Sequence, residues 1–124
     1  MAVKFFKCLT CGNVAVKLVD STVPMFCCGK KMEELIPNTE DASGEKHVPV
    51  VTKLDGGKIK VEVGSVAHPM LPEHHIAFIY VETDKGGMYV NLTDKPEAVV
   101  TVGEEKVVAV YEYCNLHGLW KTEL

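Results

Sequence analysis

Four cysteines near the start of the chain constrain its fold more than any other feature. They are Cys8, Cys11, Cys27 and Cys28. The segment that holds them, Lys4 to Ile36, has too few large apolar residues to form a hydrophobic core. Folded units below about 40 residues usually need a metal ion or disulfides. The first residues lack the apolar core of a signal peptide, so we expect reduced thiols rather than disulfides. A C-x2-C pair followed by a second close pair therefore predicts a tetrahedral metal site.

The identity of the metal is less constrained, because tetrahedral sulfur sites accept iron or zinc. Side chains of neighbouring residues diverge along an extended chain, so Cys27 and Cys28 should distort a tetrahedron relative to two C-x2-C pairs. Structural zinc sites mostly use the wider spacing. The spacing therefore favours a mononuclear iron, with zinc as the alternative metal and a disulfide-linked or free-thiol knuckle as the alternative to metal.

Composition and charge exclude several classes of protein. Hydrophobic residues make up 47% of the chain and charged residues 24%, as in folded globular domains. The net charge is -4 and all 13 basic residues are lysines, so the chain lacks the arginine that makes bidentate contacts with phosphate or guanine. No apolar run approaches the roughly 18 residues of a membrane helix. We expect a cytoplasmic globular protein without a nucleic-acid or membrane partner.

A polar stretch from residue 37 to residue 44 divides the chain into two predicted modules, residues 1–37 and 38–124. In the second module, short β-branched runs alternate with turns, which predicts an antiparallel β sandwich or small barrel and hence an all-β protein. Asp55-Gly56-Gly57 predicts a hairpin turn. No helix longer than a turn or two is expected. The expected strands are His47 to Leu54, Lys58 to Val63, Ile76 to Glu82, Gly87 to Leu92, Ala98 to Val102 and Lys106 to Tyr113.

All five histidines lie in this second module, together with the fifth cysteine, Cys114. A single histidine is more often a surface residue than a ligand, and a single buried cysteine usually acts as a small apolar side chain. Their gathering in segments with turn residues weakens that interpretation, because loops at the rim of a β scaffold often carry function. Neighbours on a strand point to opposite faces, so His74 and His75 should not share one ion. We assign His74 to the site and leave His75 out, and the same alternation also fits the opposite choice.

The resulting candidate ligands are His47, His68, His74, Cys114 and His117. Four imidazoles and one thiolate exceed the ligand number of a tetrahedral zinc site, and they leave one octahedral position open. An open position indicates chemistry at the metal. A thiolate ligand raises the electron density on iron, as in thiolate-ligated haem. The set predicts a redox iron that acts on a small oxygen species.

Taken in order, these motifs resemble those of the desulfoferrodoxins, the two-iron class of superoxide reductase. The resemblance runs from Phe6 to Lys121. The two cysteine pairs resemble the family's desulforedoxin-like module, which binds a rubredoxin-type iron through four thiolates. The motifs that resemble its catalytic domain, an immunoglobulin-like β barrel, are Glu45-Lys46-His47-Val48-Pro49-Val50, Val66-Ala67-His68-Pro69-Met70, His74 and Tyr113-Cys114-Asn115-Leu116-His117-Gly118-Leu119-Trp120.

The resemblance implies roles for individual residues. The four histidines of the candidate set would be equatorial iron ligands and Cys114 the axial ligand. Glu45 resembles the carboxylate that closes the sixth position on ferric iron, and Lys46 resembles the lysine that attracts superoxide. The implied activity is one-electron reduction of superoxide to hydrogen peroxide, a detoxification reaction, with electrons from rubredoxin or a similar donor. A homodimer is expected from the family and because the small module cannot bury a core alone.

Two other functions fit part of the pattern. A zinc-ribbon adaptor fused to a β domain would explain the four cysteines but not the histidines. A rubredoxin-like electron carrier would use the four-cysteine iron and leave the second module as a docking domain. Superoxide dismutase activity fits less well, because ferric iron must then oxidise superoxide, and a thiolate ligand with a carboxylate cap works against that step.

Overall fold

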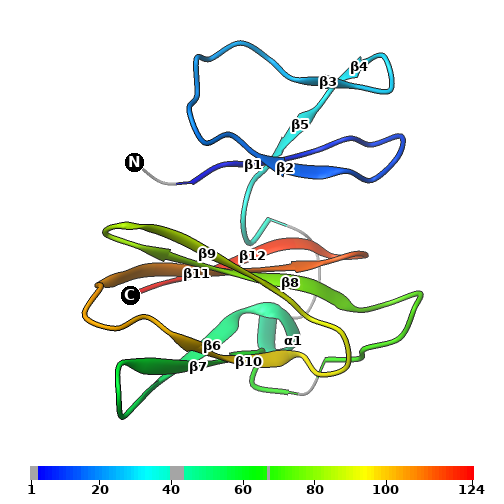
Figure 1. Ribbon diagram of the computed structural model, residues 1–124. Helices are drawn as coiled ribbons and strands as arrows, with labels where there is room; N and C mark the ends of the chain where they lie inside the picture. Colours follow the sequence, from blue (N-terminus) through cyan, green and yellow to red (C-terminus); the bar gives the residue numbers. More distant parts are fainter. Residues whose placement is uncertain (1–2, 40–43, 67) are drawn as a thin grey trace. The chain divides into compact units, whose positions relative to one another are not determined.

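The computed structural model describes residues 3–39, 44–66 and 68–124, without the side chains of residues 44 and 45. The chain divides into two compact units, residues 1–36 and 37–124 (Figure 1). The expected all-β class is confirmed: a small unit with four clustered cysteines precedes a unit of antiparallel sheets. The helix found in the described residues, α1 (Gly44–His47), has four residues. No helix in the described residues is long and apolar enough to cross a membrane.

The first unit consists of two very small sheets. One sheet has the order β2-β1-β5, and the other is the hairpin β3-β4. The strands are β1 (Phe5–Lys7), β2 (Val14–Val16), β3 (Phe26–Cys27), β4 (Lys30–Lys31) and β5 (Glu33–Leu35). Among the described residues of this unit, the buried apolar side chains are Phe5, Cys8 and Met32. So small a core leaves the unit dependent on another source of stability.

The second unit is a sandwich of two antiparallel sheets, with the orders β10-β7-β6 and β12-β11-β8-β9. The strands are β6 (Pro49–Leu54), β7 (Lys58–Val63), β8 (Ile76–Thr83), β9 (Gly86–Asn91), β10 (Glu97–Thr101), β11 (Val107–Cys114) and β12 (Gly118–Glu123). Named A, B, C, C′, E, F and G in chain order, they pair as A-B-E and C′-C-F-G. This pairing is the arrangement of immunoglobulin-like sandwiches.

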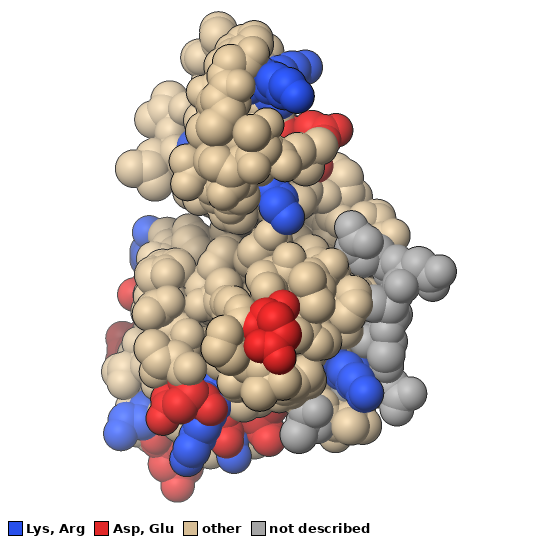
Figure 2. All heavy atoms as spheres, turned by 90° about the vertical axis from the view of Figure 1, so that its right-hand side faces the viewer, with Lys and Arg blue, Asp and Glu red and all other residues tan. Residues whose placement is uncertain are grey.

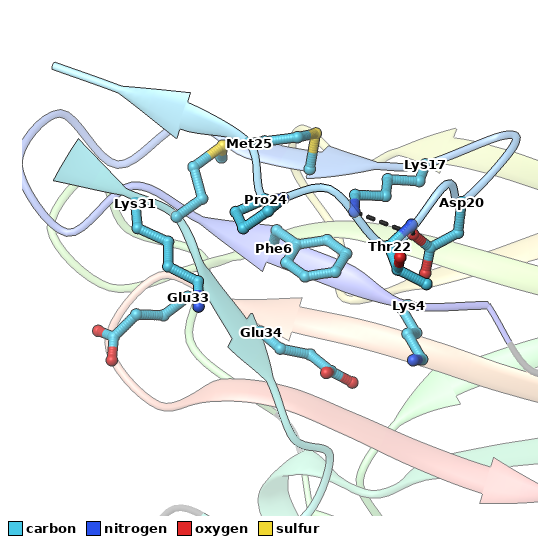
Figure 3. Close-up of a pocket in the computed structure, with 11 residues that line it drawn as sticks. Lys4, Phe6, Lys17, Asp20, Thr22, Pro24, Met25, Lys31, Glu33 and Glu34 are labelled. Carbon is cyan, nitrogen blue, oxygen red and sulfur yellow. Dashed lines mark hydrogen bonds and ion pairs between the residues drawn. The ribbon is translucent and has the colours of Figure 1, made fainter. Parts of the chain in front are cut away.

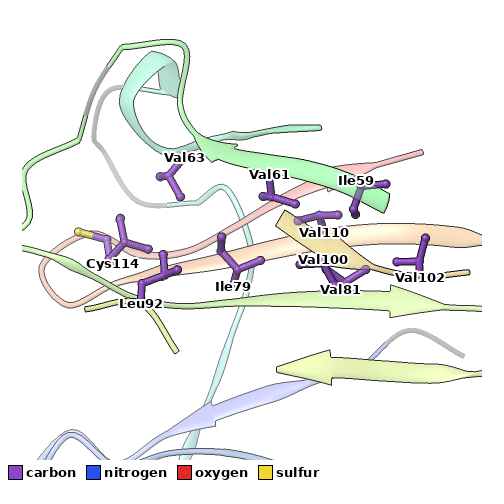
Figure 4. Close-up of a cluster of buried hydrophobic side chains, with 11 residues drawn as sticks. Ile59, Val61, Val63, Ile79, Val81, Leu92, Val100, Val102, Val110 and Cys114 are labelled. Carbon is purple, nitrogen blue, oxygen red and sulfur yellow. The ribbon is translucent and has the colours of Figure 1, made fainter. Parts of the chain in front are cut away.

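Alternating residues of the central strands form the core of the sandwich. On β7, Ile59, Val61 and Val63 are buried while the residues between them are not, which is the period of two expected for a strand with one buried face. They pack in one cluster with Val81 of β8 and with further aliphatic side chains of β10 and β11. Figure 4 shows Cys114 at one end of this cluster, so the core directly adjoins a candidate metal ligand.

Two local features differ from the sequence-based expectation. His47 does not begin a strand: it ends α1, and β6 starts two residues later at Pro49. The last strand, β12 (Gly118–Glu123), was not expected separately, because its buried residues Leu119 and Trp120 are adjacent rather than alternating. The other strands of the sandwich begin and end within two residues of their expected limits.

Candidate metal centres

Five loop and strand-end residues of the sandwich bring their ligand atoms to one place. His47 ends α1, His68 and His74 lie between β7 and β8, Cys114 ends β11, and His117 lies in the turn before β12. Their ligand atoms all lie within 4.8 Å of one another. This group contains the five residues that the sequence assigned to the second site, and His75 is outside it. We call it the histidine–cysteine cluster.

The four imidazoles form a closed ring in which neighbouring planes are steeply inclined to each other. Ring centroids are 4.8 Å apart for His47 and His68, 4.7 Å for His68 and His74, 5.0 Å for His74 and His117, and 4.8 Å for His117 and His47. The interplanar angles of these four pairs are 71°, 79°, 82° and 84°. The Cys114 Sγ atom lies 3.5 Å from His68 Nε2 and 3.8 Å from His117 Nδ1. Four nitrogen donors and one sulfur donor thus face a common centre.

The distances within this ring fit a metal ion. His47 Nε2 lies 3.1 Å from both His68 Nε2 and His117 Nδ1. Two nitrogen ligands at about 2.1 Å from one ion lie about 3.0 Å apart at a right angle and about 3.4 Å apart at the tetrahedral angle. The Nε2 atom of His74 is buried without a hydrogen-bond partner, which is costly unless a ligand satisfies it. The donor set therefore suits a metal with ligands at right angles.

The surroundings keep the ring nitrogens available as ligands. His68 Nδ1 lies 2.7 Å from the carbonyl oxygen of Pro69, which holds the proton on Nδ1 and leaves Nε2 free. Burial lowers the pKa of His68 to about 4, so this imidazole is neutral at pH 7. Burial raises the pKa of the Cys114 thiol, and hydrogen bonds from the backbone at Leu116 and His117 oppose that effect.

Trp120 supports two of the rings, and the sequence analysis assigned it no role. Its indole stacks on His47 with the ring centroids 5.0 Å apart and the planes at 19°. Its Nε1–H donates a hydrogen bond to the carbonyl oxygen of His117 at 3.0 Å. Trp120 is the last residue of the motif that also contains Cys114 and His117. Its place in that motif could have indicated a supporting role beside the ligands.

Glu112 is a further group that the sequence analysis did not single out. It lies on β11 two residues before Cys114, it is 0% exposed, and both of its carboxylate oxygens are buried without a hydrogen-bond partner. Burial raises the pKa of Glu112 to about 9. A buried carboxyl without partners is rare in folded proteins, and this one lies two residues from a candidate ligand.

The two residues expected beside the ligands belong to α1. Lys46 is exposed and directly precedes His47. The backbone of Glu45 lies in the same helical turn, and its side chain is outside the described residues. Residue 67, which belongs to the motif around His68, is also outside them.

The four cysteines of the first unit form a second cluster. The Sγ atoms of Cys8, Cys11, Cys27 and Cys28 lie within 4.8 Å of one another, and all four thiols are free. The Cys11 and Cys27 sulfurs are 3.6 Å apart. N–H groups point at these sulfurs: Cys11 N donates to Cys8 Sγ at 3.4 Å, and Asn13 Nδ2 donates to Cys27 Sγ at 3.5 Å. We call this group the four-cysteine cluster.

The backbone at Cys28 explains how adjacent cysteines reach one point. Cys28 has a φ of 54°, in the left-handed region, and Gly29 follows with a φ of 72°. Neighbouring side chains diverge only while the chain is extended, and the left-handed turn rotates the second sulfur toward the first. The distortion expected for an extended Cys27–Cys28 pair is thus relieved by the turn.

The thiols of this cluster influence each other. A hydrogen bond from the Cys11 backbone lowers the pKa of Cys8 to about 6. Hydrogen bonds to the Cys11, Cys8 and Cys27 sulfurs raise the pKa of Cys28 to about 12. The cluster loses its first proton easily and its last with difficulty, because thiolates repel one another. A bound cation would remove this repulsion, so the donor set fits a metal ion.

A separate hollow of about 710 Å³ lies in the first unit (Figure 3). Phe6, Pro24, Met25 and Met32 line it together with lysines and acidic residues, and Lys17 forms an ion pair with Asp20 at 3.0 Å inside it. None of the clustered cysteines lines this hollow. It therefore gives no support to the metal-site assignment.

Comparisons with known proteins identify the family of the chain. The desulfoferrodoxin family model matches residues 39–123. The chain is 44% identical over 120 residues to the desulfoferrodoxin of Desulfarculus baarsii, covering 95% of this chain and 94% of the relative. It is 46% identical over 122 residues to that of Syntrophotalea carbinolica, covering 95% and 94%. The crystal structure of the superoxide reductase from Treponema pallidum matches 99% of this chain and 100% of its own, with a TM-score of 0.82 and 34% identity. With sequence, fold and both clusters in agreement, the chain belongs to the desulfoferrodoxin family.

Proposed function

We propose that this protein is a superoxide reductase whose catalytic iron is bound by His47, His68, His74, His117 and Cys114. The observation that carries the proposal is the closed ring of four imidazoles with one thiolate beside it, all ligand atoms lying within 4.8 Å. Five such donors leave one position of an octahedron for a substrate. The similarity to a solved superoxide reductase over 99% of the chain supports the same activity.

Iron held by these five residues would supply the electron that, together with two protons, converts superoxide to hydrogen peroxide. The chain's own residues prepare the site for this reaction. Neutral imidazoles add no charge, whereas the Cys114 thiolate adds one negative charge that stabilises the ferric product. Trp120 holds His47 by stacking and His117 through its carbonyl, which keeps both ligands in place.

Lys46 is proposed to attract the anionic substrate. The whole chain carries a net charge of -4, which repels superoxide at long range. On the face drawn in Figure 2, lysines and acidic residues are interspersed. The exposed Lys46 directly precedes a ligand, where its ammonium group acts over a Debye length of about 8 Å. Glu45 is proposed to close the sixth position once the iron is ferric.

The four-cysteine cluster is proposed to bind a second iron as part of a module of residues 1–37, followed by a catalytic module of residues 38–124. Its donor set suits iron, and zinc is the alternative metal. Rubredoxin or a similar small protein is proposed to return an electron to the catalytic iron after each turnover. We also propose a homodimer, because the first unit buries few apolar side chains of its own.

The test combines metal content with product analysis. We expect two irons per chain, one peroxide formed for each superoxide consumed, and no release of oxygen. His74→Ala should abolish iron binding at the histidine–cysteine cluster, and His75→Ala, the matched control, should retain it. One zinc per chain without reductase activity would favour the adaptor, and iron in the four-cysteine cluster alone would favour the electron carrier. One peroxide for every two superoxides, with oxygen released, would indicate a dismutase.

A further inference from the structure

Asn115 lies between two residues of the histidine–cysteine cluster and contacts the loop that carries a third. Its side-chain Nδ2 donates to the carbonyl oxygen of Glu73 at 3.0 Å, and its Oδ1 accepts from the His75 N–H at 2.8 Å. Its own N–H donates to the carbonyl oxygen of His75 at 3.1 Å. These three hydrogen bonds hold both sequence neighbours of His74. We infer that Asn115 is a positioning residue that fixes His74 relative to Cys114 and His117.

The side chain of His74 has less support than those of His47 and His68. His47 is stacked on Trp120, and His68 is oriented through Nδ1 by the Pro69 carbonyl. The Nε2 of His74 is buried without a partner. The backbone bonds of His74 go to Leu71, in both directions, and they close a local turn without joining it to the sandwich.

The Asn115 bonds supply that connection at the point where the regular ladder ends. The pairing of β11 with β8 shifts register between Tyr113 and Cys114, and its last pair is Cys114 with Ile76. Asn115 follows this pair and continues the connection to residues 73 and 75, which are 42 and 40 positions away in the sequence. A register shift re-aims the residues beside it, so a side chain that bridges the two strands there determines how the loop meets the strand end.

Two substitutions separate the bonds of Asn115. Asn115→Ala removes both side-chain hydrogen bonds. Asn115→Asp keeps an acceptor for the His75 N–H but replaces the donor to Glu73 with an oxygen. The chain also offers a matched control: Asn38 Nδ2 donates to the Lys121 carbonyl at 3.2 Å, and Asn38 Oδ1 accepts from the Lys121 N–H at 2.9 Å. Asn38 has a φ of 62°, so Asn38→Ala should destabilise the fold at least as much as Asn115→Ala does.

The first readout does not require metal. Hydrogen exchange of the His75 amide in the metal-free full-length protein should become at least about tenfold faster in Asn115→Ala, because its acceptor is lost. In Asn38→Ala and in Asn115→Asp the rate should stay within about threefold of the unmodified protein. Equal exchange in Asn115→Ala and Asn38→Ala would overturn the inference.

The second readout rests on the proposed function. Transfer of iron from the histidine–cysteine cluster to a chelator should be roughly tenfold faster in Asn115→Ala and about threefold faster in Asn115→Asp, as for other groups that orient metal ligands. Asn38→Ala and the four-cysteine iron of every variant should keep the unmodified rates. Unmodified rates in both Asn115 variants would also overturn the inference. If the unmodified protein binds no iron at this cluster, the proposed function fails, and hydrogen exchange alone decides the role of Asn115.

Discussion

At the level of single residues, Lys46 allows a direct test of local charge. Replacing it with alanine should slow the reaction with superoxide by about three- to tenfold and flatten its dependence on ionic strength, because attraction of an anion is screened by salt. The rate constant is measurable by pulse radiolysis at several salt concentrations.

Lys85→Ala serves as the control for Lys46→Ala. Lys85 is also exposed, but it lies in the turn between β8 and β9, away from the ligand-bearing loops. This variant should keep both the rate and its salt dependence. Equal behaviour of the two variants would remove Lys46 from substrate attraction.

Glu112 makes stability depend on pH. Its pKa is about 9 in the folded protein and about 4.5 when exposed, so between these values the unfolded chain carries the charge and the folded protein keeps the proton. Raising the pKa of an acid destabilises the folded protein. This loss of stability grows as the pH rises through the window, by up to about 1.4 kcal/mol per pH unit. Glu112→Gln should therefore stabilise the metal-free protein, and more strongly at pH 8 than at pH 5.

Chemical unfolding of the metal-free protein at several pH values measures this effect, since no bound ion then influences the carboxyl. The exposed Glu104 provides the control, and Glu104→Gln should change stability little at any pH. A Glu112→Gln stability difference that is constant from pH 5 to pH 8 would contradict a neutral buried carboxyl.

At the level of secondary-structure elements, the hairpin between β6 and β7 is tied to the loop after β10. Gly57 has a φ of 71°, and its carbonyl accepts hydrogen bonds from the N–H groups of Val102 and Gly103 at 2.8 and 2.9 Å. A Cβ at Gly57 would lie 2.9 Å from the Gly103 Cα, a backbone atom that cannot easily move. Gly57→Ala should therefore lower the free energy of unfolding by about 2–4 kcal/mol, through a left-handed backbone and a steric clash.

Gly56→Ala is the matched control for the hairpin. Gly56 has a φ of 77°, but a Cβ there meets nothing within 4 Å. This variant should cost only about 1 kcal/mol, from the backbone conformation alone. Equal losses in thermal or urea unfolding would mean that contact with Gly103 contributes nothing.

The elements also differ in how well the sequence predicts them. The strand Lys58–Val63 agrees with its expected limits because polar and apolar residues alternate along its whole length. The helical turn α1 and the strand β12 have no such alternation. The strand β12 is held by a contact with a distant residue, because the Thr122 hydroxyl donates to the carbonyl of Pro49 in β6 at 2.6 Å.

At the level of the whole molecule, the two units should respond differently to removal of metal. The first unit buries few apolar side chains, whereas the sandwich has a continuous core. A strong chelator should therefore unfold the four-cysteine unit and leave the sandwich folded, since metal binding there is coupled to folding. Hydrogen exchange should show lost protection in residues 3–36 and retained protection in β7, β8 and β11.

A Cys11→Ser variant provides the comparison for this experiment. It should show the same loss of protection in residues 3–36 without any chelator, because one thiolate ligand is missing. Retained protection in the first unit after complete metal removal would contradict a metal-dependent fold.

The ligand chemistry of the protein is predictable from its residue order alone. The types and spacing of its cysteines and histidines, together with the alternation of its strands, predicted two metal-ligand sets and an all-β fold, because ligand identity and side-chain period are local properties. The folded chain was needed to show which neighbour of the His74-His75 pair faces the cluster, how Cys28 turns toward Cys27, and which residues support the rings. These features depend on contacts between residues such as Asn115 and Glu73, 42 positions apart, which form only once the sheets pair.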